Sequence, residues 1–136
     1  MSWDLFIQDL PAEAQRVEDI PDDFRPRPLG SRSELIARIR EVQPRVDFSD
    51  PSWGKLEGEG FSIEISMGSK DLVQSVALHV RGGPATVDVV ATLTRHLGFR
   101  ALDIGAPSGF FDPESARASF ARWREYRDRV VGSEEG

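Results

Sequence analysis

Two stretches decide the fold of this chain: residues 61–67, Phe61-Ser62-Ile63-Glu64-Ile65-Ser66-Met67, and residues 76–81, Val76-Ala77-Leu78-His79-Val80-Arg81. In both, apolar and polar side chains alternate with a period of two, which is typical of a strand with one buried face. The turn-forming residues 68–71 separate them. We therefore expect the two stretches to pair as a hairpin that buries its aliphatic row and turns its polar row the other way.

Working outward from this hairpin, the same alternation predicts strands at about 2–9 and 53–57 and a short strand at 99–104. Ser31 and Glu34 form a capping box, which predicts a helix at 32–43. Pro84 and Gly98 bound a second predicted helix at about 84–97. A third is expected from about 113 to 130, with its inward stripe formed by Phe120, Trp123 and Val130.

The predicted order is therefore β-α-β-β-β-α-β-α, an α+β fold with an antiparallel or mixed sheet packed by helices. A ferredoxin-like arrangement is one option, and the pairing order stays open. We expect one domain over residues 1–131 and a disordered tail at 132–136.

Residues 11–30 combine several prolines with the acids Glu18, Asp19, Asp22 and Asp23, which disfavours long regular structure. We expect a wrapping loop, with a single helical turn at 11–17. Connections of this length are unusual in a compact domain unless they are anchored or functional. The expected anchors are Val17, Ile20 and Phe24.

Composition narrows the function classes. The net charge of −6 opposes generic nucleic-acid or anionic-membrane binding and fits a basic protein partner better. The chain has no cysteine and no long apolar run, so we expect a cytoplasmic protein with neither disulfides nor a membrane span. With two histidines and no EF-hand spacing, no metal site and no cofactor is predicted.

Strand parity defines the candidate ligand-binding residues. Glu64, His79 and Arg81 share the face opposite the aliphatic row, where they would suit anion binding or acid–base work. Gly82 and Gly83 follow at the passage from strand to helix, where free backbone N–H groups meet an anion in some proteins. The favoured alternatives are a solvated cross-strand salt-bridge set and a plain turn. We assign no catalytic residue.

The candidate partner-binding residues are the acids Asp19, Asp22 and Asp23 and the aromatics Phe24 and Trp53. Further aromatics, Phe6, Phe110 and Phe111, have no obvious place in the core by parity or by their loop position. We expect the loop at 11–30 or the third helix to cover these rings and Trp53, and otherwise they would form an apolar patch suited to a partner. Aromatic side chains that are left exposed are typical anchors of protein interfaces.

Three segments resemble a group of small bacterial proteins with no assigned activity: residues 3–11, residues 21–30 and Leu78-His79-Val80-Arg81-Gly82-Gly83. This resemblance covers most of the chain and implies no activity, cofactor or catalytic residue. In size, acidity and α+β pattern the chain is also similar to immunity proteins that neutralise bacterial toxins, which is an analogy of fold alone.

Two functions follow as hypotheses. The first is a non-enzymatic interaction module, immunity- or adaptor-like, that docks an acidic surface onto a basic protein with aromatic anchors. The alternative is a small enzyme or anion-binding domain built around Glu64, His79 and Arg81. A homodimer through the sheet face or an exposed edge is a third interpretation.

Overall fold

A computed structural model describes residues 3–122, and within them a six-stranded antiparallel sheet organises the molecule. The strand order is β3-β4-β5-β7-β1-β8. The strands are β1 (Trp3–Gln8), β3 (Asp47–Asp50), β4 (Trp53–Gly58), β5 (Phe61–Ser66), β7 (Val76–Gly82) and β8 (Arg100–Leu102). Two short strands, β2 (Gly30–Ser31) and β6 (Leu72–Val73), pair separately.

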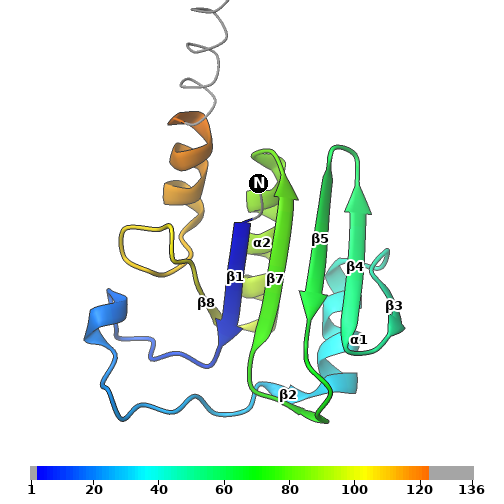
Figure 1. Cartoon of the computed structure of the whole chain (residues 1–136), viewed down its shortest axis with the longest axis horizontal. Helices are drawn as coiled ribbons and strands as arrows, with labels where there is room; N and C mark the ends of the chain where they lie inside the picture. The colour runs from blue at the N-terminus through cyan, green and yellow to red at the C-terminus, as the bar shows by residue number, and fades with distance from the viewer. Residues whose placement is uncertain (1–2, 123–136) are drawn as a thin grey trace, which may run out of the picture.

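Two helices pack on one face of the sheet, α1 (Arg32–Val42) and α2 (Ala85–Leu97), and Figure 1 shows both behind the strands. Both were predicted from the sequence and lie wholly within the described residues. A third helix covers residues 113–122 of the described part, beyond β8. No described helix crosses the face of the sheet that is turned toward the viewer in Figure 1.

The α+β class and the predicted order of elements are confirmed, and the sheet is antiparallel throughout. β5 and β7 pair as expected, with Ile63 opposite Val80 and Ile65 opposite Leu78. Ser31 caps α1 by accepting a hydrogen bond from the Glu34 backbone N–H at 3.2 Å. Gly98 ends α2 in the left-handed conformation, at a φ of 77°.

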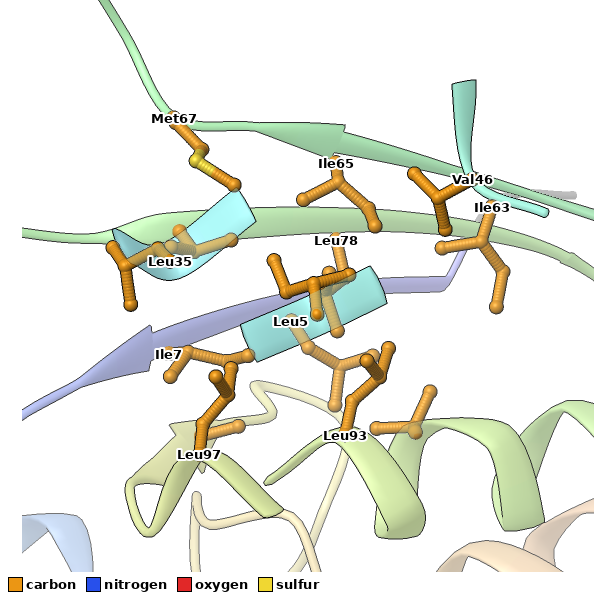
Figure 2. Packing of buried hydrophobic residues seen from close by; sticks show 14 of the residues in the cluster. Leu5, Ile7, Leu35, Val46, Ile63, Ile65, Met67, Leu78, Leu93 and Leu97 are labelled. Carbon is orange, nitrogen blue, oxygen red and sulfur yellow. The ribbon is translucent and has the colours of Figure 1, made fainter. Parts of the chain in front are cut away.

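The core lies between the sheet and the two helices (Figure 2). The aliphatic row of the strands points into it, and Leu93 and Leu97 of α2 meet Leu5 and Ile7 there. Burying a side chain of this size contributes about 1.5–3 kcal/mol. Because successive strand residues alternate sides, this burial fixes which side chains are turned to the other face.

The structure adds three short strands that the sequence did not predict, β2, β3 and β6. β3 is the sharpest case, because its sequence Asp-Phe-Ser-Asp reads as turn-forming residues. With β3, the meander between the helices has four strands in the main sheet, two more than a ferredoxin-like arrangement has. The predicted helix at 113–130 and tail at 132–136 extend beyond residue 122, outside the described residues.

The loop at 11–29 folds against β8 rather than over the sheet centre. Instead of a helical turn at 11–17 it has a single 3₁₀ turn at Val17–Asp19. A second small cluster anchors the loop: Leu10, Ala14 and Phe110 are buried, and Ile20, Phe24 and Leu102 pack against them. Val17, another expected anchor, remains 36% exposed.

Arg100 ties this loop to the sheet. Its Nη1 donates to the carbonyl oxygens of Pro11 at 2.6 Å and of Ala14 at 2.8 Å. The guanidinium carbon also lies 3.7 Å from the centroid of the Phe110 ring. A cation that satisfies two loop carbonyls and covers an aromatic ring replaces the regular hydrogen bonds that the loop lacks.

Candidate functional site

The surface with the most distinctive chemistry is the side of the main sheet that faces away from α1 and α2, here called the open face. Its side chains follow from strand parity and register, and most are half-buried or exposed. They are Trp53, Lys55 and Glu57 on β4, Ser62, Glu64 and Ser66 on β5, Ala77, His79 and Arg81 on β7, Asp4, Phe6 and Gln8 on β1, and Arg100 and Leu102 on β8.

Register arranges these side chains in rows that run across the strands. The charged row consists of Lys55, Glu64, His79 and Asp4, each directly opposite the next. Positive and negative or ionisable groups alternate along it, which stabilises neighbouring strands, because directly opposed like charges would repel.

The adjoining aromatic row follows the same register. Trp53 and Phe6 stand near its two ends, with the small Ser66 and Ala77 between them, and Leu102 lies beyond Phe6 on β8. Trp53 and Phe6 are each half-buried. The row therefore carries two large aromatic side chains, and the strand positions between them hold small ones.

His79 is held in place from two sides. Its Nδ1 lies 2.9 Å from Oδ1 of Asp4, and its ring stacks on Trp53 with centroids 5.8 Å apart and planes at 20°. β5 separates β4 from β7, so the indole reaches across that strand to contact the imidazole. When Nδ1 donates to Asp4, the neutral ring keeps Nε2 as an acceptor.

The structure brings the predicted trio onto one face but does not bond it together. Glu64 stands directly opposite His79, whereas Arg81 lies two residues along β7, opposite Ser62. Within residues 3–122, neither the Glu64 side chain nor the Arg81 side chain makes a hydrogen bond or ion pair. His79 therefore stands between two carboxylates, those of Glu64 and Asp4.

Gly82 and Gly83 shape the passage from β7 to α2. Gly82 has a φ of +140°, and a Cβ built on it would lie 2.5 Å from the Cβ of Phe61. The Gly83 carbonyl accepts hydrogen bonds from the Thr86 hydroxyl at 2.7 Å and the Thr86 backbone N–H at 3.1 Å. Both glycines have local structural roles, so an anion site here stays a prediction.

The predicted partner-binding residues fall on two separate surfaces. Asp19 accepts backbone N–H groups of Gln15 and Arg16 at 3.1 Å each, which shapes the loop, while Asp22 and Asp23 are exposed. Phe24 packs half-buried in the small cluster beside β8. Trp53 lies on β4, toward the other end of the strand order, so it belongs to the open face alone.

Sequence reasoning missed Asp4, Lys55 and Arg100 as parts of this arrangement. Asp4 and Lys55 sit at the outward parity of their strands, so the strand order would have placed them in the charged row. Arg100 had no local signal, because the carbonyls it binds lie 89 and 86 residues away in the chain.

Two other features lack the geometry of a binding site. Asp47 and Asp50 each accept hydrogen bonds from the serine two residues on, Ser49 and Ser52, and these bonds lower the pKa of both carboxyls. Among residues 3–122, no group of three His, Asp or Glu side chains converges as a metal site. A cleft of about 200 Å³ beside α2 and β8 is smaller than usual ligand pockets of about 300–1,000 Å³.

The described helices include none long and apolar enough to cross a membrane. No protein-family model matches the sequence, and no curated protein matches it either.

Proposed function

We propose that this chain is a non-enzymatic protein-interaction module, immunity- or adaptor-like, that acts in the cytoplasm and docks a protein through the open face. One observation carries the proposal: Trp53 and Phe6 stand half-exposed on a sheet face that no described helix covers. Aromatic side chains provide large contact areas and dominate the binding energy of many interfaces.

The fixed orientation of the Trp53 side chain supports this function. Its stacking on His79, which is itself bonded to Asp4, holds the indole in place before any partner arrives. A preorganised anchor loses little side-chain entropy on binding, so more of the contact energy is available to the complex. Lys55 lies in the row next to the aromatic row, and Glu57 and Arg81 lie one row further on the same side, so exposed charges border the aromatic row on that side as in the polar rim of an interface.

The charge of the whole chain favours a basic partner over an acidic one. Its net charge is −6, and Glu18, Asp22 and Asp23 are exposed on the loop beside β8. Such an excess acts mainly on the rate of encounter and weakens as salt screens it. We therefore propose that association with a basic protein slows as ionic strength rises.

The test places a photo-crosslinking amino acid on each side of the molecule in the full chain, in its native cells. One variant carries it at Ser66, at the centre of the open face, and the matched control carries it at Thr92, exposed on α2. We expect a stoichiometric crosslinked protein from position 66 that disappears when Trp53 is replaced by alanine. Equal capture from both positions, or none from position 66, would contradict the proposal.

A second function is retained because Asp4 fixes the orientation of His79, as a site for ligand binding or acid–base chemistry requires. In this proposal Glu64, His79 and Arg81 surround a small anionic ligand, with Gly82 and Gly83 nearby. Replacing both His79 and Arg81 with alanine separates the two functions. Loss of ligand-induced thermal shifts in a panel of small anions supports the second, and unchanged behaviour removes it.

A further inference from the structure

The charge pattern of the open face is complementary to itself when a second copy of the chain is turned over onto it. The relevant operation is a two-fold axis parallel to the strands and midway between β5 and β7. That axis places β4 against β1 of the other copy and β5 against β7, because the strand order is β4-β5-β7-β1. Isologous contacts of this kind are the commonest form of protein dimer.

Under this operation the charged row meets itself. Lys55 faces the opposite charge of Asp4 of the other copy, and Glu64 faces the imidazole of His79, because register places these four residues in one row. Each pair occurs twice in a two-fold dimer. Arg81 is offset sideways from Glu57 of the other copy by one strand spacing, about 4.8 Å, in addition to the separation between the two sheets.

The aromatic row matches in the same way. By register, Trp53 is opposite Phe6 of the other copy and Ser66 is opposite Ala77. Because the indole reaches across β5 to His79, the Trp53 rings of the two copies lie toward the centre of the interface. Two sheets pack face to face about 10 Å apart, which leaves room for the rings to interdigitate.

The alternative two-fold orientation is disfavoured by the same residues. An axis across the strands at the charged row would place each strand against its own copy, so that Lys55 faces Lys55 and Glu64 faces Glu64. Like charges opposed across an interface destabilise it. The charge pattern thus selects the axis that runs along the strands.

From this match we propose that the occupant of the open face is a second copy of this chain. The proposal rests on the proposed function, because it takes the open face as the docking surface. The charges of the face itself balance, Lys55, Arg81 and Arg100 against Asp4, Glu57 and Glu64, so the net charge of the chain does not exclude this partner.

The size of the face sets how tight the dimer is. The four overlapping strands, about 4.8 Å apart and about six residues long at about 3.3 Å per residue, give a footprint of roughly 400 Å² per copy. Stable complexes usually bury about 800 Å² per partner. We therefore expect reversible association, in which the measured mass rises with protein concentration from that of the 15.2 kDa monomer toward twice that value.

The test is sedimentation equilibrium of the full chain with charge-reversal variants. Lys55→Glu opposes Asp4 of the other copy, and Asp4→Lys opposes Lys55, so each variant alone should have a dissociation constant at least tenfold above that of the wild type. An equimolar mixture should dimerise again, because one of the two pairs then has its charges exchanged and the other keeps its native charges. Lys70→Glu, in the exposed turn before β6, is the matched control and should not change association.

Recovery on mixing also shows that both variants are folded. The proposal is overturned if the wild type stays monomeric up to millimolar concentration, or if Lys55→Glu associates as the wild type does, which would indicate contact through another surface such as the edge strand β3. If the chain stays monomeric and crosslinking from position 66 captures a different protein, the homodimer proposal is wrong and the proposed function stands. If the chain stays monomeric and position 66 captures nothing, both proposals are wrong.

Discussion

Arg100→Met is the substitution that best tests how the loop at 11–29 is attached. It removes the hydrogen bonds to the carbonyls of Pro11 and Ala14 and the cation above the Phe110 ring, while keeping an apolar side chain in place. Hydrogen bonds from a charged donor contribute about 1.5–3 kcal/mol each and a cation–π contact about 0.5–2 kcal/mol. Contacts made by one side chain do not add fully, so we expect the free energy of unfolding to fall by about 2–4 kcal/mol.

The assay is urea unfolding together with limited trypsin digestion. Arg16 is the tryptic site of the loop, because proline follows Arg25 and Arg27 and protects them. We expect faster cleavage after Arg16 in Arg100→Met and no change in Arg95→Met, an exposed arginine of α2. A loss below about 0.5 kcal/mol with unchanged cleavage would refute the role assigned to Arg100.

Two further predictions concern backbone strain and acid stability. Gly82→Ala should lower the free energy of unfolding by about 1–3 kcal/mol, because a φ of +140° strains any residue with a side chain and the new Cβ would clash with the Cβ of Phe61. The control is Gly83→Ala, which has open space around its Cβ position and should leave stability nearly unchanged. Thermal denaturation of the two variants measures the difference. The Asp47 and Asp50 carboxyls have a pKa below 3.8 in the folded chain, so their contribution to stability is present above about pH 4 and is lost as the pH falls through the lower folded value. Replacing both by asparagine should therefore flatten the acid limb of the stability profile, and an unchanged limb would show that the Ser49 and Ser52 hydrogen bonds are not responsible.

Local sequence patterns predicted most of the helices and strands, because alternation and capping depend on residues that are close in the chain. The alternation of Ile63 and Ile65 with Glu64 gave the side of each residue in β5, and the capping residue Ser31 gave the start of α1. β3 was missed because two aspartates and a serine in four residues are typical of turns, and its pairing with β4 comes from the tertiary fold. Strand order was not predictable from such patterns, since they do not specify which strands become neighbours.

For the candidate site, too, sequence patterns predicted the face on which each residue lies but not its contacts with distant strands. Parity placed Glu64, His79 and Arg81 on one face, and the structure agrees. The contacts that hold His79 depend on strands far apart in sequence: Asp4 lies 75 residues away, and Trp53 reaches it across an intervening strand. Such contacts require the strand order, which explains why Trp53 and His79 entered the sequence analysis as members of two different candidate sites.

The open face, turned away from α1 and α2, is where we propose that this protein meets another chain. The most direct measurement is a dilution series of two-dimensional ¹H–¹⁵N spectra on the uniformly labelled wild type. We predict that amide signals of β1, β4, β5 and β7 move with concentration while those of α1 and α2 stay fixed. Shifts confined to the helices or to β3 would contradict this proposal. So would signals that stay fixed at every concentration, if crosslinking at position 66 also captures nothing.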